Sequence, residues 1–216
     1  MALHPEGVFT SGPIAHLVGL AAGGPDPLEW EVLRITRVAR SDHWDPAWRH
    51  TARPLACQLD YLATAFSEEF FAACPQDARR AWTAAAGSKS VPEFMTELAM
   101  LLRLADRQWP AEYEDVPLAH WEVRARFPLL MALDSWAYDG EHGSYEESLL
   151  AFIEAEHPFC SYELLPRLTQ ALEVRTLGTQ SAAFAASFRA LEPAATPETL
   201  DTLARVSFAH LTEQHG

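Results

Sequence analysis

Helix-start signals recur along this chain, whereas the alternating apolar patterns of β-strands are nearly absent. Serine followed three residues later by glutamate forms a capping box, in which each side chain accepts a hydrogen bond from the backbone N–H of the other residue. This spacing occurs from Ser90 to Glu93 and from Ser144 to Glu147. The segments 26–29 and 196–198 add a proline at the first helical position. The sequence therefore predicts an all-α fold.

Helical periodicity between these caps predicts about eight or nine helices. We expect them at residues 27–40, 54–73, 75–86, 92–108, 117–138 with a break near Pro128, 144–157, 161–174, 179–191 and 197–213. Residues 1–25 are expected to be irregular, because Pro13 and His16 interrupt their apolar stretch. The chain has no fixed-period repeat and no low-complexity linker, and its 49% hydrophobic content suffices for one large core. We predict a single compact irregular helical bundle over residues 1–216.

The charge balance argues against nucleic acid and membrane surfaces as partners. The chain has 16 basic and 30 acidic residues, a formal net charge of -14, and no cluster of Lys and Arg. No apolar run approaches the ~20 residues of a membrane span, and no basic start precedes the apolar N-terminal stretch. The cysteines, Cys57, Cys74 and Cys160, are odd in number and far apart, which excludes a disulfide framework. We expect a cytoplasmic protein.

Acidity is concentrated in one region, residues 112–163, which holds twelve acidic residues against two arginines. Carboxylates interleaved with aromatic residues are what electrostatic steering toward a basic protein would use. The candidate contact residues are Asp139, Glu141, His142, Glu146, Glu147 and Glu154, with Trp121 and Tyr113 as aromatic anchors. We therefore predict an acidic protein-binding module, an inhibitor or immunity-type protein that occludes a basic partner. A solvated acidic face is the alternative.

Asp134 is the one charged residue in a segment, 127–138, that is apolar nearly all round. A helix with this pattern is buried, and an unpaired carboxylate inside it would cost several kcal/mol, on the order of any unpaired buried ion. We predict that Asp134 is a buried polar residue with a partner, with Arg124, Arg126 or a histidine as candidates. A poised acid or base in a pocket is the functional alternative.

A helical metal-binding protein or enzyme is the second hypothesis, using Asp134, Glu154 and His157, with Glu141 and His142 as further candidates. Helical bundles bind metal through Glu-x-x-His motifs, and Glu154 to His157 is one such spacing. The expected buried stripe of this helix contains Tyr145, Leu149, Leu150, Phe152 and Ile153. That stripe directs Glu147 and Glu154 toward water, and His157 precedes Pro158 at a helix end, where a ligand is poorly held.

Two weaker hypotheses remain. His157 and Cys160 are three residues apart and could form a nucleophile and base, but no third orienting group is visible, so a structural cysteine is favoured. The Trp-rich segment 41–50 could line a small-molecule pocket in the bundle. We predict no metal site, no cofactor and no catalytic residue, and leave the oligomeric state open.

Overall fold

The computed structural model of the protein describes residues 5–41, 52–107, 115–131, 133–137 and 140–215. The chain divides into two compact units, residues 1–116 and residues 117–216. Every regular element in the described ranges is a helix, which confirms the predicted all-α class. Each unit is compact by itself, and a single domain across residues 1–216 stays a prediction.

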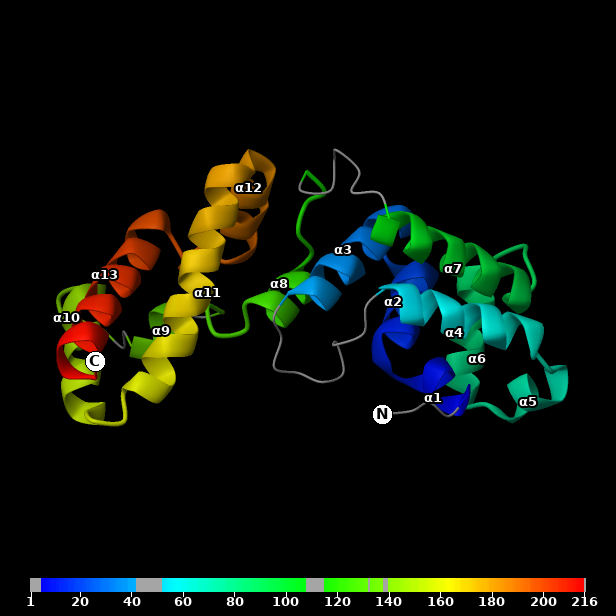
Figure 1. Ribbon diagram of the computed structural model, residues 1–216, viewed down its shortest axis with the longest axis horizontal. Coiled ribbons are helices and arrows are strands. Elements are labelled where there is room, and N and C mark those ends of the chain that lie inside the picture. Colours follow the sequence, from blue (N-terminus) through cyan, green and yellow to red (C-terminus); the bar gives the residue numbers. More distant parts are fainter. Residues whose placement is uncertain (1–4, 42–51, 108–114, 132, 138–139, 216) are drawn as a thin grey trace. The chain divides into compact units, whose positions relative to one another are not determined.

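Helices α1 to α7 form the first unit (Figure 1). Their bounds are α1 (Pro5–Thr10), α2 (Gly12–Gly23), α3 (Leu28–Arg40), α4 (Ala52–Thr64), α5 (Glu68–Ala73), α6 (Gln76–Ala86) and α7 (Val91–Arg107). Helix α4 packs along α7, and α2 packs against α6. In the core, the fully buried Trp82 ring lies 4.9 Å from the Phe9 ring and 6.3 Å from the Phe94 ring, measured between centroids. Burying each such side chain contributes about 1.5–3 kcal/mol, so this aromatic cluster is a main source of the unit's stability.

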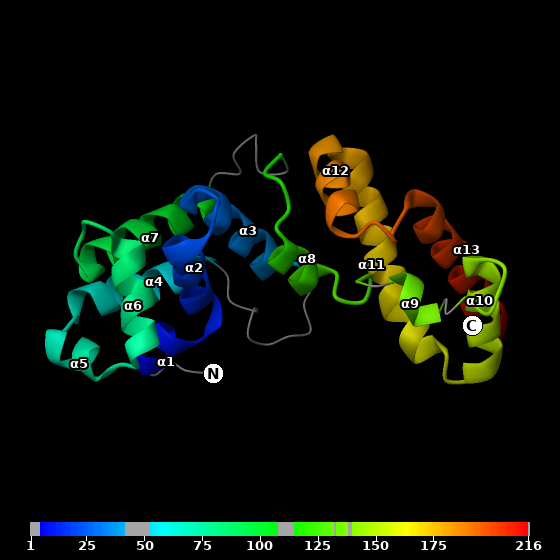
Figure 2. The same cartoon turned by 180° about the vertical axis from the view of Figure 1, so that it is seen from behind.

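Helices α8 to α13 form the second unit, which Figure 2 shows from behind. Their bounds are α8 (His120–Arg126), α9 (Leu133–Ala137), α10 (Tyr145–Glu156), α11 (Ser161–Gln180), α12 (Ala182–Leu191) and α13 (Pro197–Gln214). Helix α13 packs against both α10 and α11. The core is built around Phe127, Phe184 and Phe188, whose rings stack or meet edge to face. The packing of α13 on α10 and α11 places the turn between α10 and α11 close to the C-terminal half of α13.

The described part of the chain contains thirteen helices, more than the eight or nine predicted. The predicted helix 54–73 is divided into α4 and α5, because Ser67 starts a new helix by accepting a hydrogen bond from the Phe70 N–H. The predicted helix 117–138 is divided into α8 and α9 around Pro128, which restricts the backbone of Phe127 to a non-helical conformation.

The expectation of an irregular segment over residues 1–25 is wrong, because α1 and α2 occupy most of it. Pro13 does not break α2, since it lies in the first turn, where the missing N–H group is not needed. Elsewhere the predicted boundaries hold to within a few residues, except that α11 continues to Gln180 and α12 begins only after Ser181. No helix in the described ranges has the length and apolar character required to cross a membrane.

Candidate metal centre

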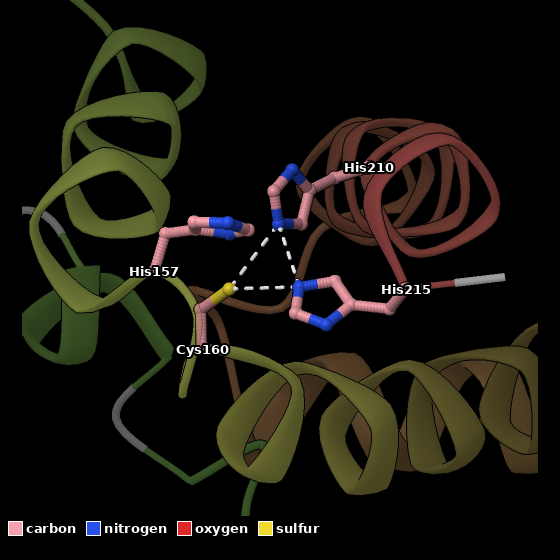
Figure 3. Close-up of side chains that lie close together, drawn as sticks. All are labelled: His157, Cys160, His210 and His215. Atoms are coloured by element: carbon pink, nitrogen blue, oxygen red, sulfur yellow. Dashed lines mark hydrogen bonds between the residues drawn. The ribbon is translucent and has the colours of Figure 1, made fainter.

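Four metal-ligand side chains converge at one corner of the second unit: His157, Cys160, His210 and His215 (Figure 3). His157 directly follows α10, and Cys160 directly precedes α11. His210 lies in the last turns of α13, and His215 directly follows that helix. Each residue offers one ligand atom, and these four atoms all lie within 4.8 Å of one another. The site therefore joins the α10–α11 turn to the end of α13.

The end of α13 is what brings its two histidines together. Residues five apart on an ideal α-helix point about 140° away from each other, so His210 and His215 could not meet on a continuous helix. The helix ends at Gln214, and His215 has a φ of -129°, which departs from the helical value and turns its side chain away from the helical direction. As a result, the two Nε2 atoms lie 3.2 Å apart.

The α10–α11 turn is held by backbone hydrogen bonds, although the sequence suggested a poorly held helix end. The N–H groups of His157, Phe159 and Leu164 donate to Ile153, Glu156 and Cys160, at 3.0, 2.7 and 2.9 Å. Cys160 itself has no exposed surface. The thiol and the His157 ring are consequently presented from a defined turn rather than from a loose end.

The spacing of three ligand atoms matches one face of a tetrahedron. Cys160 Sγ lies 3.2 Å from His210 Nε2 and 3.5 Å from His215 Nε2, and the two nitrogens are 3.2 Å apart. Tetrahedral zinc with Zn–N of about 2.05 Å and Zn–S of about 2.3 Å requires N···N of about 3.3 Å and N···S of about 3.6 Å. Each observed edge is within about 0.4 Å of the required one. The cluster could accept such an ion with only small movements.

Hydrogen bonding alone satisfies this triangle poorly. The Nε2 atom of a neutral imidazole carries either one proton or one lone pair, so it can donate or accept but cannot do both. Two such atoms and one thiol can form two good hydrogen bonds, which leaves the third contact without a proton to share. A cation at the centre would interact with all three lone-pair donors at once. The arrangement is therefore better suited to a metal ion than to a hydrogen-bonded triangle.

The electrostatics of the corner favour the neutral, metal-binding form of His210. Burial lowers the pKa of His210, and the neighbouring His215 and His157 lower the same pKa further by charge repulsion. The centroid of the His157 ring lies 5.5 Å from that of the His210 ring and 5.2 Å from that of the His215 ring. Neutral imidazole is the state that coordinates metals.

The acidic residues predicted to bind a partner do not belong to this cluster. Glu141, His142, Glu147 and Glu154 are exposed, and Trp121 is half-buried. Glu146 forms an ion pair with Arg205, at 2.5 Å. Tyr113 and Asp139 lie outside the described residues, as does the side chain of Asp134 in α9, so the burial of Asp134 stays a prediction.

Part of the local negative charge is balanced by arginines that the regional count omitted. Glu146 is paired with Arg205, and Glu163 with Arg167, both arginines lying beyond residue 163. Within the region, the fully buried Glu122 carboxylate accepts a hydrogen bond from Arg126. The uncompensated acidity of residues 112–163 is thus smaller than the sequence suggested.

Of the residues named for a metal site from the sequence, only His157 belongs to the cluster. Glu154 is exposed as expected, but Leu150 is half exposed instead of buried. Sequence analysis paired His157 with Cys160 and missed His210 and His215, which are 50 and 55 residues beyond Cys160. No family model, curated protein or solved structure matches this chain, so the site is interpreted from its own geometry.

Proposed function

We propose that this chain is a metal-binding helical protein whose second unit holds one zinc ion through His157, Cys160, His210 and His215. The observation that carries the proposal is the triangle of Cys160, His210 and His215, whose edges match those of a tetrahedral zinc site. Metal binding was the second hypothesis from the sequence. The ligand set proposed here differs, with Cys160, His210 and His215 in place of Asp134 and Glu154.

Zinc is the preferred ion because of the donor atoms. One thiolate and up to three imidazoles are borderline-soft ligands, which favour zinc over the oxygen-preferring magnesium and calcium. The compact corner supplies nitrogen and sulfur but no carboxylate among the four clustered residues. Other transition metals that favour nitrogen and sulfur, such as copper or nickel, are outcomes that the metal analysis distinguishes.

The bound ion would also stabilise the folded state of the second unit. It would join the end of α13 to the α10–α11 turn, two segments that are about 50 residues apart. A ligand that binds only the folded state stabilises it by about 2.7 kcal/mol at a free concentration 100 times its Kd. Zinc should therefore raise the melting temperature, and a chelator should reverse the change.

The direct test measures zinc stoichiometry and affinity by isothermal titration calorimetry and elemental analysis of the full chain. We expect about one equivalent of zinc, and an affinity at least about 100-fold weaker in His210→Ala and in His215→Ala, since losing an outer-shell partner alone costs about tenfold to 100-fold. His142→Ala is the matched control, because His142 is an exposed histidine of the same unit outside the cluster. Less than about a tenth of an equivalent of any transition metal would contradict the proposal.

Docking to a basic protein stays the second proposal, and one feature of the second unit supports it. Phe159 and Tyr162 expose 68% and 78% of their surface, next to the exposed Glu156 and Glu163. Aromatic anchors with neighbouring carboxylates suit a cationic partner. Binding that does not weaken between low and high salt would contradict this proposal.

A further inference from the structure

A groove between α10 and α13 leads to the metal centre. It has a volume of about 530 Å³, within the range of small-molecule sites. His157 and His210 line the groove, whereas Cys160 and His215 do not. Two of the four candidate ligands thus line an open space.

The two helices run in the same direction along this groove. Glu146, near the start of α10, is paired with Arg205, and His157, just beyond the end of α10, lies beside His210. The eleven residues from Glu146 to His157 span about 16 Å at the helical rise. The groove therefore extends from an ion pair at one end to the metal ligands at the other.

The walls of the groove suit a molecule with an apolar body. Leu150, Ile153, Val206 and Ala209 supply apolar surface, and Leu150 is half exposed where it lines the groove. Glu154 and Glu213 add two carboxylates to the same lining. At the far end, the Arg205 side chain keeps 61% of its surface exposed despite its ion pair. Its guanidinium can still donate to an oxygen of a bound molecule.

His157 differs from the other three candidate ligands. It is exposed, whereas Cys160 is buried and His210 and His215 are half-buried. Direct contacts of 3.2–3.5 Å join the other three ligand atoms, and they alone match the face of a tetrahedron. Three protein ligands and one exchangeable position are typical of catalytic zinc, whereas four fixed ligands are typical of structural zinc.

We infer that the metal centre is open toward the α10–α13 groove, where a small organic molecule with an oxygen donor and an apolar body binds the metal at the position of His157. This inference rests on the proposed metal binding. Cys160, His210 and His215 hold the ion, and His157 occupies the fourth position only while the groove is empty. The centre is then a ligand-binding site and not only a structural clamp.

The test uses the full chain loaded with cobalt(II), whose visible absorption reports changes in coordination, and acetohydroxamate as the probe. We expect the probe to change the absorption of the loaded protein in a saturable way. His157→Ala should retain cobalt and bind the probe at least about tenfold more tightly, because no side chain competes for the fourth position. Ala209→Trp fills the groove and should weaken probe binding by about tenfold or more.

Ala190→Trp is the matched control, since Ala190 is an exposed alanine of α12 that does not line the groove. It should bind cobalt and probe like the unmodified chain. An absorption spectrum that the probe leaves unchanged, or that disappears because the probe removes the ion, would overturn the open site while leaving metal binding intact. A chain that never acquires the cobalt spectrum would instead refute the proposed function itself.

Discussion

Two polar clusters among the described residues, one in each unit, were not revealed by sequence patterns and differ in kind. In the first unit, the buried Arg34 guanidinium donates to Glu31 and to Asp26, each at 2.7 Å. In the second unit, one thiol and three imidazoles face one another. The first cluster joins opposite charges, whereas the second contains only groups that can offer a lone pair.

This difference teaches how to separate a structural cluster from a binding site. A guanidinium beside two carboxylates already contains the cation that the carboxylates require, because the charges are opposite and the guanidinium donates to both. Convergent imidazoles and a thiol contain no cation of their own, so a metal cation bound from solution would stabilise them most. The predictions below test this contrast by altering matched residues in the two units.

The largest expected effect comes from removing the cation of the cluster formed by Arg34, Glu31 and Asp26. Arg34→Met leaves Glu31 buried without its cation, and breaking a buried pair in this way costs about 3–5 kcal/mol. The free energy of unfolding, from chemical denaturation, should fall by this amount equally in zinc and in chelator. A loss that zinc reverses would show that the two clusters are not independent.

The next effect compares the two buried cysteines, one in each unit. Cys160→Ser should weaken zinc binding by about 100-fold, equivalent to about 2.7 kcal/mol, because a hydroxyl replaces a thiolate ligand. Cys74→Ser should leave the zinc affinity unchanged, since Cys74 Sγ contacts the Phe70 carbonyl oxygen and no histidine cluster. Calorimetric titration of both variants measures the contrast, and equal affinities would remove Cys160 from the ligand set.

Much of the fold could be predicted because its signals are local. Ser90, Ser144 and Thr196 each precede a helix where the sequence placed one, since capping depends only on residues three apart. Helix α2 was missed for a local reason too. Its sequence is apolar and contains Gly and Pro, so it lacks the polar face by which a surface helix is recognised.

The candidate metal site could not be predicted, because its ligands meet only in the tertiary fold. His157 and Cys160 are separated from His210 by α11, α12 and most of α13. His210 and His215 would diverge on a continuous helix and meet only where α13 ends. The sequence offered only a weak signal: two of these residues are three apart around Pro158, and the other two are five apart in the last part of the sequence given.

A smaller change in the free energy of unfolding is expected from replacing buried serine hydroxyls in the second unit. Ser207 in α13 is fully buried, and its Oγ has no hydrogen-bond partner among the described residues. Ser207→Ala should raise the free energy of unfolding by about 1.5 kcal/mol, because an unpaired buried hydroxyl is removed. Ser187→Ala is the matched control with the opposite sign, since Ser187 Oγ accepts from the Leu118 N–H and donates to the Phe184 carbonyl. Destabilisation by Ser207→Ala would indicate a bound water or ligand at that hydroxyl.

The smallest effect compares the helix caps of the two units. Each N-cap serine replaced by alanine should cost about 1 kcal/mol at neutral pH, measured by chemical denaturation. Ser90 donates to the Glu93 carboxylate from both its N–H and its hydroxyl, and these bonds lower the pKa of Glu93. Because the folded pKa is the lower one, this stabilisation is present above the unfolded pKa and is lost as the pH falls through the folded pKa.

In α10 the Glu147 carboxylate accepts a hydrogen bond from the Gly143 N–H instead. The Ser144 hydroxyl accepts a hydrogen bond from the Glu147 N–H. The cost of Ser90→Ala should therefore shrink in acid, whereas the cost of Ser144→Ala should depend less on pH. Zinc affinity should not change in either variant, because Ser144 lies at the far end of α10 from His157. A weakened zinc site in Ser144→Ala would mean that the whole of α10, and not only the α10–α11 turn, positions the ligands.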